Sequence, residues 1–284
     1  MVLDGRFDPV RAAEVARLVA RLGLDGVWWR QPPLTGTAPG DLAAFLSRLR
    51  AEAAPASAGL IADSELADPG LLTGLTSRPA GAGTDSPGPL RLALAGPAPR
   101  IARWLDWLAD HPGAFADAAV PAGMPAAVPA GTAAGAAAMP LGTPLAIFVP
   151  IFAGRAVDPA VSAAAAQAAG GPVLVELAVS VGRTTGVAHA RAHAEDLFAV
   201  TGQPAQDGLF GTLEECQASA ARLAHAGATE LVCYLPRSDD LPDVLAQLSA
   251  IAVGAALLRP GEPPSSPPPP PTGWGGRRSP VADT

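Results

Sequence analysis

Two arginines stand at positions in the sequence where a phosphate group could be bound. Arg155 and Arg183 each follow a glycine, and Arg183 comes with Gly182 at the end of the apolar run Val173–Val181. A guanidinium group binds phosphate through paired, charge-assisted hydrogen bonds, and a glycine lets the backbone turn tightly beside it. Each arginine could instead be a solvated loop charge, and the sequence leaves both interpretations open.

Small and polar residues near Arg183 could supply further hydrogen-bond donors. Ser180 lies near the end of the same apolar run, and residues 184–186 read Thr-Thr-Gly before a predicted helix that begins at Val187. Gly211 and Thr212 stand at the start of another predicted helix, where free backbone amides suit a phosphate. These residues predict an anion-binding loop.

Three more candidates follow other predicted strands. Trp29 could stack on a flat aromatic ring, although Trp28 and Trp29 point to opposite faces of one strand, so one of them belongs to the core. Asp63 could accept a hydrogen bond or a proton, or it could cap the next helix. Gly96 follows a strand-like segment and completes the set of candidate ligand-binding residues.

The sequence does not support metal or hydrolytic chemistry. His189 and His193 are one helical turn apart, but no glutamate of the His-Glu-x-x-His pattern lies between them. No Gly-x-Ser-x-Gly turn is present, and all 19 basic residues are arginine, so a Schiff base with lysine is excluded. We therefore predict no metal site, and the residues alone identify no catalytic group.

The segments that must position the candidate residues alternate between strands and helices. Such alternation predicts a parallel sheet, and eight strands are the number that a (β/α)8 barrel of the TIM type requires. In that barrel the candidate residues would meet at the carboxyl ends of the strands. The predicted strands are Val2–Leu3, Gly26–Arg30, Ala58–Ala62, Leu90–Ala95, Phe115–Val120, Leu145–Ala153, Val173–Val181 and Thr229–Leu235.

Apolar residues at helical spacing indicate the helices between these strands. Thr212 and Glu215 have the spacing of a capping box, which marks the start of the helix that ends at Gly227. The other predicted helices are Val10–Leu22, Asp41–Arg50, Pro69–Leu75, Pro97–Ala109, Pro159–Ala169, Val187–Ala199 and Leu241–Val253.

Composition predicts one α/β domain with a proline-rich tail. Residues 1–258 form the compact barrel, whose first strand is thin or truncated, and residues 259–284 form a disordered tail. The net charge of −7, with arginines scattered along the chain, argues against nucleic acid as a partner. The most apolar run, Leu145–Phe152, is too short to span a membrane, and we expect a cytoplasmic protein. Cys216 and Cys233 are expected to be buried free thiols.

The stretch Gly211–Pro236 resembles the last helix and strand of the luciferase-like monooxygenase superfamily. It begins Gly-Thr-Leu-Glu-Glu and ends with Ala-Gly before an apolar strand, and members of that superfamily carry a Gly-Thr-Pro-Glu-Glu type of helix start there. The segment from Phe7 through Trp28 is similar to the superfamily's first helix and second strand. Leu92–Pro97 and Val179–Ala194 are similar to later units. The resemblance covers most of Phe7–Gly254.

This resemblance implies a barrel that binds F420, or alternatively FMN, and reduces a small organic substrate. It implies that Trp29, Asp63, Gly96, Arg155, Ser180, Gly182, Arg183, Gly211 and Thr212 surround the cofactor. The sequence departs from the superfamily after the second strand, where Gln31–Pro33 follow in place of the usual polar pair. A second hypothesis is therefore a non-catalytic barrel that acts as a binding or scaffold partner, paired with a second copy or with an active homologue.

Overall fold

The fold is described by a computed structural model. It covers residues 1–3, 7–30, 42–63, 69–72, 90–95, 98–111, 114–121, 145–149, 172–194, 208–234 and 241–257. The predicted helix Pro159–Ala169 and the tail 259–284 lie outside these residues.

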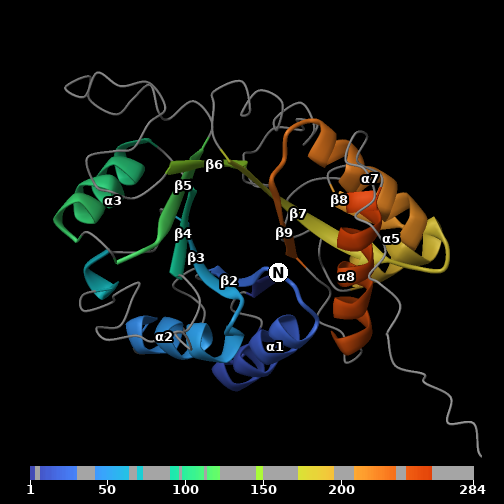
Figure 1. Cartoon of the computed structure of the whole chain (residues 1–284), viewed down its shortest axis with the longest axis horizontal. Helices are drawn as coiled ribbons and strands as arrows, with labels where there is room; N and C mark the ends of the chain where they lie inside the picture. The colour runs from blue at the N-terminus through green and yellow to red at the C-terminus, as the bar shows by residue number, and fades with distance from the viewer. Residues whose placement is uncertain are drawn as a thin grey trace, which may run out of the picture.

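Eight parallel strands of the described part of the chain close into a ring (Figure 1). Each strand pairs with the next one, and the last pairs back to the first through Val2 and Tyr234. This closure confirms the predicted TIM-type barrel, including its thin first strand. The strands of the ring are β1 (Val2–Leu3), β2 (Gly26–Arg30), β3 (Ser57–Asp63), β4 (Leu90–Ala95), β5 (Asp117–Pro121), β6 (Leu145–Val149), β7 (Val173–Val181) and β9 (Glu230–Tyr234).

A further strand, β8 (Gly208–Gly211), lies beside the carboxyl half of β7. The first part of β7, Val173–Val175, pairs with β6, whereas its last part, Ala178–Val181, pairs with β8. The nine-residue β7 therefore extends beyond the ring and reaches β8, as Figure 1 shows. Strand β8 was not predicted from the sequence, because a four-residue segment bounded by two glycines carries too short an apolar pattern.

Helices surround the ring of strands on its outer side (Figure 1). Helix α1 begins where the Asp8 carboxylate accepts hydrogen bonds from the amides of Val10 and Arg11, both at 2.9 Å, and Pro9 occupies the first helical turn. The described helices are α1 (Pro9–Arg21), α2 (Leu42–Ala53), the short 3-10 helix η1 (Pro69–Leu72), α3 (Ala98–Asp110), α5 (Thr185–Ala194), α7 (Leu213–His225) and α8 (Leu241–Leu257).

Apolar side chains form two cores, one inside the ring and one between the ring and the helices. The strands alternate between them: Trp28 lies inside the ring, and Trp29 lies outside it with Phe45 of α2. Gly59 of β3 makes room for the inner tryptophan, because a Cβ at this position would overlap the indole of Trp28. The inner core is formed by Val2, Trp28, Ile61, Ala93, Ala95, Ala119, Ala146, Phe148, Leu174, Ala178, Val232 and Tyr234.

Two further expectations concern the thiols and the membrane. Cys216 and Cys233 are buried and free, as predicted. Burial raises the pKa of each thiol to about 11, so both are protonated at neutral pH. Among the described residues, no helix is long and apolar enough to cross a membrane.

Candidate functional site

A cluster of three polar side chains lies inside the barrel. Arg30 ends β2, Glu176 lies in the middle of β7, and Tyr234 ends β9. The Nη1 atom of Arg30 is 2.6 Å from Oε1 of Glu176 and 2.5 Å from the hydroxyl oxygen of Tyr234. All three residues are buried, with the exposed fraction of the Glu176 side chain at 0%. We call these three residues the inner cluster.

The inner cluster is placed toward the carboxyl ends of the strands. Arg30 and Tyr234 are the last residues of their strands, and TIM-type barrels bind their ligands at this end. Glu176 faces the interior because it alternates along β7 with outward residues such as Val175 and Leu177. The polar groups thus interrupt an apolar interior where such barrels carry their active sites.

Burial dominates the electrostatics of Tyr234. It raises the pKa of this phenol well above the ordinary value of 10.0, and the nearby Glu176 carboxylate raises it further. The Arg30 guanidinium acts in the opposite direction, and its Cζ atom lies 5.8 Å from the centre of the tyrosine ring. The phenol therefore keeps its proton at neutral pH, and a hydrogen bond with the Glu176 carboxylate also raises its pKa.

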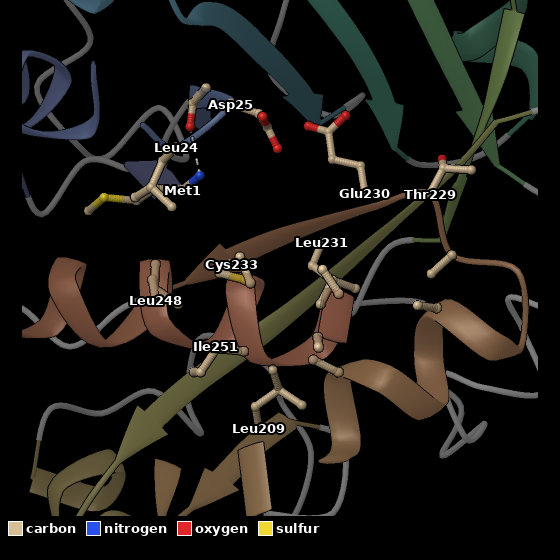
Figure 2. Close-up of a pocket in the computed structure, with 17 residues that line it drawn as sticks. Met1, Leu24, Asp25, Leu209, Thr229, Glu230, Leu231, Cys233, Leu248 and Ile251 are labelled. Atoms are coloured by element: carbon tan, nitrogen blue, oxygen red, sulfur yellow. Dashed lines mark hydrogen bonds between the residues drawn. The ribbon is translucent and has the colours of Figure 1, made fainter. Parts of the chain in front are cut away.

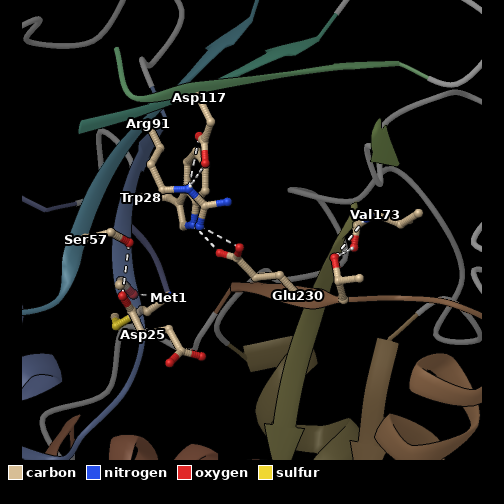
Figure 3. Close-up of polar contacts among 10 residues, drawn as sticks. Met1, Asp25, Trp28, Ser57, Arg91, Asp117, Val173 and Glu230 are labelled. Atoms are coloured by element: carbon tan, nitrogen blue, oxygen red, sulfur yellow. Dashed lines mark hydrogen bonds and ion pairs between the residues drawn. The ribbon is translucent and has the colours of Figure 1, made fainter. Parts of the chain in front are cut away.

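A second polar cluster closes the amino end of the barrel (Figure 3). Nε of Arg91 is 2.9 Å from Oδ2 of Asp117, and Nη1 of Arg91 is 2.5 Å from Oε2 of Glu230. The guanidinium lies 5.1 Å from the ring centre of Trp28, whose Nε1 donates to Oε1 of Glu230 at 3.2 Å. Arg91, Asp117 and Glu230 satisfy one another near the starts of β4, β5 and β9, so we assign the cluster to the stability of the barrel.

The structure brings five of the predicted site residues together at the carboxyl ends of β7 and β8. The amide of Gly182 donates to the carbonyl of Gly211 at 2.9 Å, next to the paired residues Val181 and Gly211. Arg183 follows immediately and is exposed. The hydroxyl of Ser180 is buried and donates to the carbonyl of Ala188 at 2.8 Å, so it joins β7 to α5.

The start of α7 does not offer free amides in the way that the sequence analysis expected. The predicted capping box is present, and Oε2 of Glu215 accepts from the amide of Thr212 at 2.8 Å. The same oxygen accepts from the hydroxyl of Thr185, also at 2.8 Å. A carboxylate thus takes the place proposed for a phosphate next to Thr212, and its charge opposes a second anion there.

Trp29 is the clearest correction to the predicted site. Its side chain is 1% exposed and contacts Phe45 at a ring-centre distance of 4.6 Å, on the outer side of the barrel. It is therefore separated from the interior, where the corresponding indole is that of Trp28. Asp63 ends β3 opposite Ala95, and this backbone position is all that the structure describes of it. The remaining predicted site residues, Gly96 and Arg155, lie outside the described residues.

Glu176 and Tyr234 were not among the site residues predicted from the sequence, although two signals pointed to them. Glu176 is the single charged residue within the apolar strand Val173–Val181, and a charge at such a position must have a partner. Tyr234 is the only tyrosine of the chain and stands at the end of the last strand. Arg30 ends a strand in the same way, so the three positions could have been linked through the predicted barrel.

The fold of this chain is similar to the folds of several solved structures. No family model and no curated protein matches the sequence. The apo structure of MsnO8 superposes with a TM-score of 0.55 at 15% identity, over 91% of this chain and 99% of that one. A second similar structure is a type II Baeyer–Villiger monooxygenase in complex with FMN, the oxygenating constituent of 3,6-diketocamphane monooxygenase from the CAM plasmid of Pseudomonas putida. It superposes with a TM-score of 0.52 at 12% identity, over 88% of this chain and 92% of that one.

These likenesses support the fold predicted from the sequence, a TIM-type barrel similar to those of the two proteins. At identities of 15% and 12% they show the fold alone, and function must be argued from the residues of this chain. A dihydropteroate synthase from Xanthomonas albilineans superposes with a lower TM-score of 0.45 at 16% identity, over 90% of this chain and 91% of that one.

The single tyrosine allows a direct test of the inner cluster. Because the pKa of Tyr234 is raised, the folded state holds the phenolic proton more tightly than the unfolded state, and stability falls as pH rises above 10.0. Tyrosinate absorbance should therefore stay absent past pH 10.0 and appear only together with the loss of tryptophan fluorescence that marks unfolding. The chain in concentrated urea is the control and should titrate near 10.0. A tyrosinate signal near that pH in the folded chain would place Tyr234 in solvent.

The Glu215 carboxylate generates a second pH prediction. Its hydrogen bond from the Thr212 amide, followed by the one from Thr185, lowers its pKa below the ordinary value of 4.5. A lowered pKa contributes stability that is complete above pH 4.5 and disappears as pH falls through the folded value. Urea unfolding should show the wild type more stable than Glu215→Gln at neutral pH, with the difference vanishing in acid. If the stability difference between the wild type and Glu215→Gln did not change with pH, the charge of Glu215 would not be its cause.

Proposed function

We propose that this chain is a luciferase-like oxidoreductase that binds F420, or alternatively FMN, and reduces a small organic substrate. The observation that carries the proposal is the inner cluster, a buried ionic and phenolic group at the end of the barrel where such folds bind ligands. The FMN complex of the diketocamphane monooxygenase constituent supports the cofactor class by its fold.

Of the described residues, Arg183 fits the phosphate of such a cofactor, whereas the start of α7 is occupied by the Glu215 carboxylate. Arg183 is exposed past the carboxyl end of β7, where the backbone bends at Arg183 and Thr184 before α5 begins. A guanidinium at this place would hold a phosphate through charge-assisted hydrogen bonds. Trp29, in contrast, is buried against α2 and cannot stack on a ring in the barrel interior.

The chemistry of hydride transfer would belong to the cofactor when it is bound. The contribution of the chain would be to bind, orient and exclude water. Tyr234 would hold a proton at its phenolic oxygen. Arg30 of β2 would keep that phenol in place by donating a hydrogen bond to its oxygen. Glu176 would balance the charge of the guanidinium within the apolar interior.

One observation favours the second hypothesis, a non-catalytic barrel that acts as a binding or scaffold partner. The interior of the described barrel is filled by large side chains, among them Trp28, Phe148 and Tyr234, each at most 2% exposed. The residues of the inner cluster also pair with one another. Both features are those of a packed core, and the partner in this case would be a second copy or an active homologue.

Titration of the purified chain with F420 and with FMN distinguishes the two hypotheses. Quenching of cofactor fluorescence should reveal binding of one molecule per chain, with F420 binding more tightly than FMN and saturating at about 50 µM. If neither cofactor bound at this concentration, the oxidoreductase proposal would be contradicted and the scaffold hypothesis would be favoured. Co-purification of a homologous subunit would favour that hypothesis directly.

Arg183 gives the matched residue-level test. Arg183→Ala should weaken cofactor binding by about 1.5–3 kcal/mol, the scale of a hydrogen bond to a charged group. The melting temperature without cofactor should be unchanged, because an exposed loop arginine contributes little to folding. The control is Arg222→Ala on α7, whose guanidinium is exposed and bonded to Ser219, and this variant should bind like the wild type. Wild-type affinity in Arg183→Ala would assign that side chain to the solvated surface.

A further inference from the structure

A cavity of about 260 Å³ lies outside the ring of strands, between β9 and the helices α7 and α8 (Figure 2). It is separate from the inner cluster, because its wall is the outer face of β9, carried by Leu231 and Cys233. Its lining includes Asp25, which is exposed at the surface and precedes β2, and Glu230, which begins β9. The ligand end of the proposed oxidoreductase is the opposite end of the barrel.

The cavity exists because the facing helices offer small side chains. Alanines such as Ala224 of α7 and Ala255 of α8 line it, together with Leu248 and Ile251 of α8. A methyl group is too short to fill the space between a helix and a strand that larger aliphatic side chains fill elsewhere in the outer core. The lining is therefore apolar over most of its area, as in ligand pockets.

The mouth of the cavity carries polar groups of acidic character. The Asp25 side chain is exposed there, whereas the Glu230 carboxylate is engaged by Arg91 and Trp28. Met1 also lines this end, where its amino group donates to the carbonyl of Gly26 at 2.9 Å. A ligand with a hydrogen-bond-donating or cationic end is thus favoured over a carboxylate.

The volume defines the size of the ligand. An apolar cavity of roughly 150 Å³ is known to bind benzene, so 260 Å³ corresponds to a molecule with about ten carbon atoms. We propose that this cavity binds a compact apolar amine of that size, with its ring or chain between α7 and α8 and its amino group facing Asp25. This site is independent of the cofactor site proposed above.

Two naphthalene derivatives of matched shape test the proposal. By isothermal titration calorimetry, 2-naphthylmethylamine should bind the full chain with a Kd below about 1 mM, and 2-naphthoate several-fold more weakly. Asp25→Asn should reduce this preference, because it removes the exposed carboxylate at the mouth. Equal binding of the amine and the acid would contradict the assigned polarity.

Filling the cavity tests its location. Ala255→Leu should weaken binding of the amine by at least about tenfold. The control is Ala246→Leu, at an exposed position of the same helix outside the cavity, and its affinity should be within about twofold of the wild type. Ala224→Leu on α7 repeats the test from the other wall if the first variant does not fold. F420 titration of the same variants reports on the other end of the barrel and should be unchanged. Undiminished amine binding in the filled variants, or no binding to the wild type, would overturn the proposal.

Discussion

The ion pair between Arg30 and Glu176 is the interaction on which the barrel interior depends. The strand β1 contributes only two residues to the ring, so the seam between β2 and β9 has few backbone hydrogen bonds. Arg30 crosses this seam, because the same Nη1 atom contacts Tyr234 on β9 and Glu176 on β7. A buried guanidinium without these partners would carry the full cost of its desolvation. The three strands must therefore stay in their observed order for the charge to be satisfied.

This constraint divides the barrel into two ends with different tasks. At the amino end, Arg91 binds the carboxylates of Asp117 and Glu230, and its guanidinium lies over the ring of Trp28. At the carboxyl end, Arg30 and Tyr234 of the inner cluster are the last residues of their strands, and Arg183 is exposed past the end of β7. Polar groups that satisfy one another suit a structural role, whereas an exposed cation on a turn is suited to bind an anion. The proposed cofactor site follows from this difference. The cavity between β9, α7 and α8 is separate from it and lies on the outer side of the barrel.

Most of the fold could be predicted from the sequence, because apolar periodicity determines which segments form strands and helices. All eight strands of the ring were predicted, and the capping box at Thr212 was found from its spacing. The site was predicted less well, since it depends on which face of a strand points inward. Trp28 and Trp29 differ by one position, and only the register with neighbouring strands decides that Trp28 is the inner one. The inner cluster joins residues up to 204 positions apart, a contact that local patterns do not contain.

A double-mutant cycle on Arg30 and Glu176 tests the central claim most directly. Arg30→Met, Glu176→Leu and the double variant would be compared with the wild type by urea unfolding. The account predicts that each single change costs about 3–5 kcal/mol, because it leaves the other charge buried without its partner. The double variant should lose clearly less than the sum, with a coupling energy of at least about 1.5 kcal/mol. Losses that add within about 0.5 kcal/mol would show that the two charges do not act as a pair, and would contradict the account.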